Sequence, residues 1–520
     1  MNAPKRIDIS PEEMTALLAR AKESLSDADF EIVKGIFEMI AYLGYVVETK
    51  SASINRLLKM LFGDQNEKTS KISKKGESGN TRSNREEKEK KPGHGKNGAK
   101  EYTGGDKNTI LHETLKPKDL CPACGKGKVY DTCKPGVIVR VTGSAPCSAT
   151  VYELQRLRCN LCGEIFTAKA PEGIGKEKYD ESAGAIIALL KYGAGLPFNR
   201  LEQVQAFLGI PLPSSTQWEI VEAVADKIHP VYTAMLRNAA QGEVIHNDDT
   251  VMKILSIING QEGDEKRKGV YTTAIVSNIL DVKVALFMTG NHHAGENLAA
   301  MLIHRSAHLP APVQMCDALS RNAPKPFATI LANCIAHARR KFIDVEGNYP
   351  DECLYVLEAF EKIYINDSHT RQMTPDMRLQ YHQEKSGPVM DDLYSWLGRQ
   401  LDEKKTEPNS ELGKAISYTR KHWAKLSLFL RDGKAPLDNN ICERALKKSI
   451  LHRKNSLFYK TQHGAYIGDL FMSLIHTCTL CGVNPFEYLK TLQLHTTELF
   501  ADPDRFLPWN YQQNITAQAF

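Results

Sequence analysis

The sequence predicts a multidomain α+β protein. Its 520 residues exceed the roughly 250 to 300 at which a single hydrophobic core stops growing. In the middle of the chain, short β-rich runs alternate with helical patterns, whereas the flanking stretches have mainly helical periodicity. Hydrophobic residues form 42% and charged residues 25% of the chain, values that indicate neither wholesale disorder nor a membrane protein.

No segment has the pattern of an export signal or a membrane span. The N-terminus lacks an apolar core region, and the most apolar stretch, 32–47, is interrupted by Lys34 and Glu38, short of the about 20 residues that cross a bilayer. We therefore expect a cytoplasmic protein, in which twelve cysteines indicate metal ligation or burial rather than disulfides. The net charge of +5 is compatible with a nucleic-acid partner but does not require one.

Two N-terminal regions precede the first cysteines. Residues 1–63 are expected to be helical, with apolar residues near heptad spacing that fit a short oligomerisation coil and an ordinary helical hairpin equally well; we interpret them as self-associating. Residues 64–106 are rich in Lys, Glu, Gly and Ser, and they cannot bury enough apolar surface to offset the entropy of ordering. This stretch is expected to be a basic disordered linker, either a solvated tether or a salt-sensitive contact to a phosphate backbone.

Two C-x2-C pairs frame residues 107–172, where short β-rich runs alternate with glycine and proline turns. A pair of this spacing lets both sulfurs reach one tetrahedral zinc ion, and two pairs complete a closed structural shell that leaves no position for catalysis. We therefore predict a zinc ribbon. Its predicted Zn²⁺ ligands are Cys121, Cys124, Cys159 and Cys162.

Two further pairs have weaker context. Cys334 with His337 and Cys478 with Cys481 share the x2 spacing, which would allow a second zinc site. We instead interpret these cysteines as buried small side chains, since i,i+3 cysteines on helices commonly are.

Residues 173–240 are predicted to be helical, with a proline-rich break at 209–213. Ser214 stands three residues before Gln217, a capping-box signature for the helix that follows. The two helices around the break fit a helix-turn-helix that presents Ser215, Thr216 and Gln217 to the major groove of DNA, and they fit a plain helical bundle equally well.

A strand-rich pattern begins after Gln241. Apolar runs predict three successive strands, a helix, a fourth strand and a short helix over PFATILAN, in the order β-β-β-α-β-α. This order is typical of a ribonuclease H-like core, which we place at 241–343. A helical insertion follows at 344–435, and 436–520 complete the core with one long helix and C-terminal helices.

Three acids stand where such a core would place metal ligands. Asp248 ends the first strand, Asp317 ends the fourth, and Glu443 opens the helix after PLDNN. Phosphoryl transfer by two divalent ions needs a few carboxylates of this kind, and Mg²⁺ or Mn²⁺ suits hard oxygen ligands. The plainer interpretations are a turn residue for each aspartate and a capping box for Glu443.

Several motifs together make the chain similar to a known family. They are KPGHGKNGAKEY, CPACGKGK, RCNLCG, HNDDT, CDALSRN, CIAHARRKF, PLDNNICERALK, RKNSLF and GVNPFEYL. Over most of its length the chain resembles the bacterial transposases of the insertion sequence 66 family. The resemblance implies a DDE transposase with an N-terminal helical region, a zinc ribbon, a ribonuclease H-like core and a helical insertion. It carries the catalytic and Mg²⁺-binding roles onto Asp248, Asp317 and Glu443.

One position departs from the family pattern, which usually has Asp-Glu-Thr where this chain has Asp248, Asp249 and Thr250. Strand alternation allows only one of the two neighbouring aspartates to face the metals. We assign that role to Asp248, although the substitution leaves an acid beside it.

Basic residues follow Glu443 on the same predicted helix. They form either a wall for the DNA backbone, which we favour, or, for Lys447, an i,i+4 ion pair with Glu443. Arg339, Arg340 and Lys341 form a similar cluster, with a solvated surface as the alternative. The predicted DNA contacts on the helix are Arg444, Lys447, Lys448, Arg453 and Lys454.

By resemblance, the expected activity is binding of double-stranded transposon ends and target DNA, with metal-dependent strand cleavage and strand transfer. The partners implied are a second copy of the chain on DNA, at the nucleoid, and accessory proteins of the same element. Two alternatives are a non-catalytic zinc-ribbon DNA-binding protein derived from such an element and a general metal-dependent nuclease.

Overall fold

The structure is a computed structural model that divides the chain into two compact units, 1–139 and 140–520. The residues that it describes are 111–122, 126–130, 143–158, 160, 165–172, 177–262, 267, 269–516 and, near the N-terminus, Arg20, Lys22, Ser26, Phe30 and Val33. The predictions for 1–63 and 64–106 therefore lie almost entirely outside the described residues. Within them, the Phe30 amide donates to the Ser26 carbonyl over 2.8 Å, the i to i−4 bond of an α-helix.

The first unit contains a short antiparallel turn around Cys121. Leu120 pairs with Lys128, and the Cys121 amide donates to the Gly127 carbonyl over 2.7 Å. In the second unit, β1 (Arg156–Arg158) and β2 (Ile165–Thr167) form an antiparallel hairpin. Each cysteine pair of the predicted ribbon is thus flanked by antiparallel backbone.

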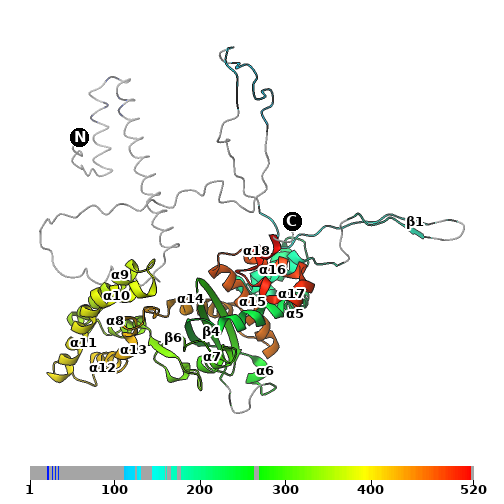
Figure 1. The fold of residues 1–520 in the computed structure, drawn as a ribbon. Helices are drawn as coiled ribbons and strands as arrows, with labels where there is room; N and C mark the ends of the chain where they lie inside the picture. The colour runs from blue at the N-terminus through cyan, green and yellow to red at the C-terminus, as the bar shows by residue number, and fades with distance from the viewer. Residues whose placement is uncertain are drawn as a thin grey trace. The chain divides into compact units, whose positions relative to one another are not determined.

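A five-stranded mixed sheet lies at the centre of the second unit, in the order β5-β4-β3-β6-β7 (Figure 1). The strands β3 (Val244–Val251), β4 (Tyr271–Ile279) and β5 (Val282–Gly290) form an antiparallel meander. β6 (Val313–Cys316) lies parallel to β3, and β7 (Ile330–Asn333) lies parallel to β6. The mixed α+β class predicted from the sequence agrees with this architecture.

The short helix predicted over PFATILAN is wrong. Its second half is the strand β7, in which Ala332 pairs with Met315 of β6 and both side chains are buried. A run of four apolar or small residues has no periodicity that separates a strand from a helical turn, and pairing with β6 decides the outcome. The order along the chain is therefore β-β-β-α-β-β-α.

Two hydrophobic cores share this sheet. The first surrounds β4 and β5, and the second packs β6 and β7 against the inserted helices. Figure 1 shows α9 to α13 on one side of the sheet and α5 with α15 to α18 on the other. The helices of the first core are α3 (Glu181–Ala188), the π-helical η2 (Leu189–Gly193), α4 (Phe198–Phe207), α5 (Ser214–Ala239), α7 (Ala294–Leu302), α14 (Asn440–Ser456), α15 (Gln462–Leu480), α16 (Pro485–Leu494), α17 (Thr496–Ala501), η5 (Pro503–Phe506) and α18 (Tyr511–Thr516).

The second core contains α8, which follows β7, and the helices of the insertion that come after it. They are α8 (Ile335–Ile343), α9 (Pro350–His369), α10 (Pro375–Lys385), α11 (Gly387–Asp402), α12 (Glu411–Lys421), α13 (Trp423–Leu426) and the 3-10 helix η4 (Leu428–Leu430). Two short elements, α6 (Leu255–Ile258) and the 3-10 helix η3 (Ser320–Asn322), follow β3 and β6. Among the helices described, none is both long and apolar enough to cross a bilayer.

A row of polar side chains on α15 covers the outer edge of β5. Asp469, Ser473 and Thr477 follow one another at four-residue spacing, so they lie on one face of the helix. They accept hydrogen bonds from the amides of Thr289, Phe287 and Ala285 over 2.6, 2.8 and 3.0 Å. These amides point away from β4, and the row supplies the partners that a neighbouring strand would otherwise give.

Burial raises the pKa of Asp469 to about 7, although hydrogen bonds from Thr289 oppose the shift. The folded protein therefore retains a proton that the unfolded chain releases between about pH 4 and 7, and this contribution to stability is lost as the pH rises through 7. We predict that Asp469→Asn, which keeps an acceptor for Thr289, becomes more stable relative to the wild type as the pH rises, by at most about 1.4 kcal/mol per pH unit. Urea unfolding at pH 5 and 8 measures the effect, with the exposed Asp281→Asn as control, and parallel pH profiles for Asp469→Asn and the wild type would contradict it.

Candidate metal and phosphate site

Strand β3 sends neighbouring side chains to opposite faces of the sheet. His246 and Asp248 face α14, because His246 Nδ1 lies 3.1 Å from Asn439 Oδ1 and Ala274, the β4 partner of Asp248, accepts from Cys442 Sγ of that helix. Asp249 faces α7, whose Ala294 amide donates to its Oδ2 over 3.2 Å. The alternation that the sequence implied therefore turns the two aspartates toward opposite faces of the sheet.

Asp317 follows the last residue of β6, in a loop held by buried amides. The Asn322 side-chain amide donates to Asp317 Oδ1, and the Asn322 carbonyl accepts from Gln314 over 2.7 Å and from Asn247 over 3.1 Å. Asn247 and Gln314 are fully buried on the paired strands β3 and β6. The loop that carries the carboxylate is thus fixed to the interior of the sheet.

Glu443 lies in the first turn of α14, and Asn439 positions that turn. The Asn439 side chain is fully buried, donates to the Asn247 carbonyl over 3.2 Å and lies against His246 of β3. Its amide donates to Cys334 Sγ over 3.2 Å, beside the start of α8. These contacts fix the N-terminus of α14 to β3, although almost two hundred residues separate the two elements in sequence.

The three predicted acids affect one another electrostatically. Burial, followed by the nearby charge of Asp317 and more weakly those of Asp249 and Glu443, raises the pKa of Asp248 to about 7. Burial also raises the pKa of Asp317. The charges of Asp317 and Glu443 both act on Asp248, so each of these two acids lies near Asp248 at the carboxyl end of β6, where a divalent cation would offset the repulsion.

His337 on α8 belongs to the same site and was not predicted there. Its Nδ1 lies 3.9 Å from Glu443 Oε1, and its charge opposes the upward shift in the pKa of Asp317. Both of these atoms, His337 Nδ1 and Glu443 Oε1, are buried without a hydrogen-bond partner among the described residues. The capping box that was the alternative for Glu443 does not form, because the Asn440 amide donates to Asp438 Oδ1 over 3.0 Å instead. The sequence signal for His337 is the Cys334-x2-His337 pair, whose spacing by itself indicates zinc.

The tightest group of potential ligands in the described chain is Cys334, His337 and Glu443, whose ligand atoms all lie within 4.8 Å of one another, closer than the three acids together. Burial raises the pKa of the Cys334 thiol to about 11, and its sulfur already accepts from the Asn439 amide. A neutral, engaged thiol is a poor metal ligand. The donor set that fits Mg²⁺ or Mn²⁺ is the oxygens of Asp248, Asp317 and Glu443, with His337 beside them.

Basic and aromatic side chains surround the acidic site on the side of the insertion. A hollow of about 230 Å³ is lined by Asp317, His337, Arg340 and Lys341 together with Tyr418 of α12. Lys341 Nζ lies 4.4 Å from the centre of the Tyr418 ring. The arrangement places cations next to acids, as a site for a phosphate and its metal ions requires.

The predicted contacts on α14 differ in their availability. Lys447 is exposed, and no ion pair within 4.0 Å joins it to Glu443, although both residues lie in the described chain. Arg453 is engaged, because its guanidinium donates to the Val251 carbonyl and to Thr250 Oγ1 at the end of β3. The other exposed basic residues of this helix are Arg444, Lys448 and Lys454.

The predicted helix-turn-helix contacts need a correction. The two helices form as α4 and α5, but Gln217 is fully buried and its amide donates to the carbonyls of Phe198 and Leu212 over 3.0 and 2.9 Å. The predicted capping box is wrong for the same reason, and the Ser214 hydroxyl instead donates to Glu202. Ser215 is exposed and Thr216 partly exposed, so only these two of the three side chains are accessible.

The cysteines of the predicted zinc ribbon are only partly described. Cys121 is half-buried, whereas Cys124, Cys159 and Cys162 lie outside the described residues. Of the other pair considered for zinc, Cys478 is fully buried and Cys481 Sγ contacts the Lys283 carbonyl at 3.8 Å. Neither joins Cys334 and His337.

Comparisons with known proteins match the region that contains Asp248, Asp317 and Glu443 to a family of transposases. The model of the Transposase IS66 family matches residues 176–467. The uncharacterized protein y4jD of Sinorhizobium fredii is 34% identical over 382 residues, which cover 70% of this chain and 73% of the relative. The uncharacterized protein y4hP of the same organism is 25% identical over 441 residues, which cover 78% and 75%. The family match includes all three acids and begins after the two cysteine pairs of the predicted ribbon.

The contacts of Asn439 predict a measurable dependence of stability. We expect Asn439→Ala to lower the free energy of unfolding by about 1 to 3 kcal/mol, because His246 and the Asn247 carbonyl each lose a buried partner. The matched control is Asn440→Ala, which removes a less buried bond from Asn440 to Asp438. Urea unfolding compares the two variants, and equal losses would show that Asn439 has no special role.

Proposed function

Because the chain belongs to the IS66 family of transposases, we propose that it is a DDE transposase with a ribonuclease H-like core. It binds double-stranded transposon ends, cleaves a strand in a metal-dependent reaction and joins the released 3′ end to target DNA. The proposal covers the substrate, the chemistry and the residues that perform it.

The observation that carries the proposal is the meeting of three acids from separate elements. Asp248 comes from β3, Asp317 from the loop after β6 and Glu443 from α14, and the charges of the latter two raise the pKa of the first. Unrelated surface acids repel one another and stay in solvent. Here buried amides fix the loop that carries Asp317, and the Asn439 contacts fix the start of the helix that carries Glu443, while the pKa of Asp248 is raised, which is typical of a functional site.

In this mechanism Asp248, Asp317 and Glu443 would hold two divalent cations. When bound, such ions activate the attacking oxygen and stabilise the leaving oxygen of a phosphodiester. His337 lies 3.9 Å from Glu443 and orients that carboxylate or donates to a phosphate oxygen. Arg340 and Lys341, beside Asp317 in the 230 Å³ hollow, neutralise the phosphate.

Longer-range DNA binding falls to exposed basic residues. Glu443, Lys447 and Lys454 follow the helical spacing of one face of α14, so a duplex at the acidic site would meet both lysines. Ser215 at the start of α5 is a further candidate contact. We also propose that the chain acts as a homo-oligomer on DNA and with accessory proteins of the same element.

A strand-cleavage assay tests the proposed activity. We expect the wild type to nick a duplex copied from the terminus of its element in Mg²⁺ or Mn²⁺, and Asp248→Asn, Asp317→Asn and Glu443→Gln each to lower the rate by about 100-fold or more, since each removes charge that stabilises the transition state. Asp281→Asn, an exposed turn residue, is the control and should retain the wild-type rate. Nicking that persists with alanine at all three acids would exclude this assignment.

The zinc ribbon makes an independent prediction. Metal analysis of the full chain should find one zinc per chain, lost in Cys121→Ser and in Cys162→Ser because three thiolates do not complete the tetrahedral shell. Cys147→Ser, which lies between the pairs without ligand spacing, should retain the ion. A wild-type chain without zinc would refute the ribbon.

A further inference from the structure

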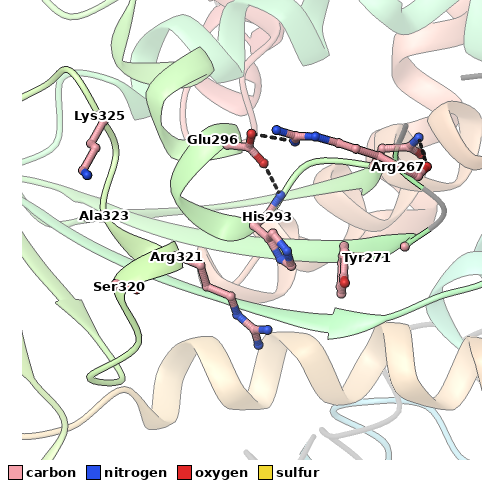
Figure 2. A pocket seen from close by; sticks show the side chains of 10 residues that line it. Arg267, Tyr271, His293, Glu296, Ser320, Arg321, Ala323 and Lys325 are labelled. Atoms are coloured by element: carbon pink, nitrogen blue, oxygen red, sulfur yellow. Dashed lines mark hydrogen bonds and ion pairs between the residues drawn. The ribbon is translucent and has the colours of Figure 1, made fainter. Parts of the chain in front are cut away.

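A second and larger hollow lies on the α7 side of the sheet, opposite the acidic site. Its volume is about 710 Å³, within the range of binding sites for small organic molecules. Figure 2 shows Tyr271 of β4, His293 before α7, Glu296 of α7, and Arg321 and Lys325 of the loop after β6 around it. No function assigned above uses this hollow.

Asp249 organises one wall of the hollow. Its carboxylate is almost fully buried, at 2% exposed, and accepts from Arg321 Nη2 over 3.1 Å and from His293 Nδ1 over 3.0 Å. The Arg321 side chain is nevertheless 45% exposed. Asp249 thus fixes the orientation of Arg321 and leaves its remaining donors accessible to a ligand.

The loop that carries Arg321 and Lys325 is packed closely onto α7. A Cβ atom at Gly295 would lie 2.5 Å from the Arg321 carbonyl and 2.4 Å from the Ala323 carbonyl, so only glycine permits this approach. The two basic residues are therefore held on a fixed backbone beside α7. A pre-formed wall of this kind lowers the entropy cost of binding.

Of the basic side chains that line the hollow, the Lys325 ammonium has no acidic partner among the residues described. Glu296 pairs with Arg267 over 2.7 Å, and Asp249 pairs with Arg321. The Lys325 ammonium makes no hydrogen bond or ion pair with the residues described here. Lys325, with the exposed edge of Arg321 and the His293 ring, favours an anion that accepts several hydrogen bonds.

We propose that this hollow binds a phosphate group of the substrate DNA strand, next to the phosphate at the acidic site. The inference rests on the proposed function, because it takes the DNA strand as the occupant. Asp248 and Asp249 are neighbours on β3, and Arg321 lies in the loop that begins at Asp317, so the two sites share a strand and a loop. A DNA strand that passes Asp317 and follows this loop would place an adjacent nucleotide against Arg321 and Lys325.

The test measures how DNA binding by the full chain depends on salt. Each phosphate contact contributes a slope of about −0.9 to the plot of log affinity against log salt. We expect Lys325→Gln to make this slope less negative by about one, so that its loss of affinity between about 50 and 200 mM salt is about 3.5-fold smaller than that of the wild type. Lys325→Arg should restore the wild-type slope, and Lys490→Gln on α16 is the matched control.

Three outcomes separate the possibilities, with the element-end duplex and inorganic phosphate as probes. A wild type that nicks DNA while Lys325→Gln keeps the full slope overturns this inference and leaves the proposed function standing. If Lys325→Gln keeps the wild-type slope but inorganic phosphate no longer protects this variant against thermal unfolding, the hollow is a site for free phosphate. This outcome likewise overturns the inference. A wild type that binds no duplex overturns both proposals.

Discussion

The buried contacts of Asn439 are the constraint on which the acidic site depends. Glu443 follows the helical insertion in the sequence. The sequence of α14 alone would not place its carboxylate near Asp248. Asn439 binds the backbone of β3 and lies against His246, while the segment before it runs along the start of α8, where the Ile335 amide donates to the Leu437 carbonyl over 3.0 Å. The end of the insertion thus returns to the start of α8, the helix that precedes the insertion. The length of the insertion therefore has little effect on the site.

The neighbouring carboxylates of Asp248 and Asp249 on β3 have different surroundings. The pKa of Asp248 is raised, whereas the Asp249 carboxylate accepts from Arg321, His293 and the Ala294 amide. Three donors occupy most of the acceptor positions of a carboxylate, so Asp249 is the less available of the two acids as a metal ligand. The acid that stands in place of the usual glutamate of the family therefore acts as a structural partner of the loop that carries Asp317.

Much of the core could be predicted because its signals are local. Apolar runs mark β3, β4 and β5, and an acid at a strand end is visible in the sequence. The roles of His337 and Asn439 could not be predicted, because their partners lie about one hundred and two hundred residues away in the sequence. Histidine and asparagine are also common on protein surfaces, so the residue types gave no signal. Gln217 illustrates the opposite error. A polar side chain at the start of a helix suggests solvent or DNA, but the Gln217 amide donates to the Leu212 carbonyl in the turn before α5 and to the Phe198 carbonyl at the start of α4, in the interior.

The polar row on α15 has a consequence for assembly. A sheet usually grows by accepting a strand from another molecule along an open edge, which requires unpaired amide hydrogens in register. Along β5 those hydrogens are already committed to Asp469, Ser473 and Thr477. These three amides are therefore not open to a strand from a second copy, and a dimer that assembles on DNA would use surfaces other than this border.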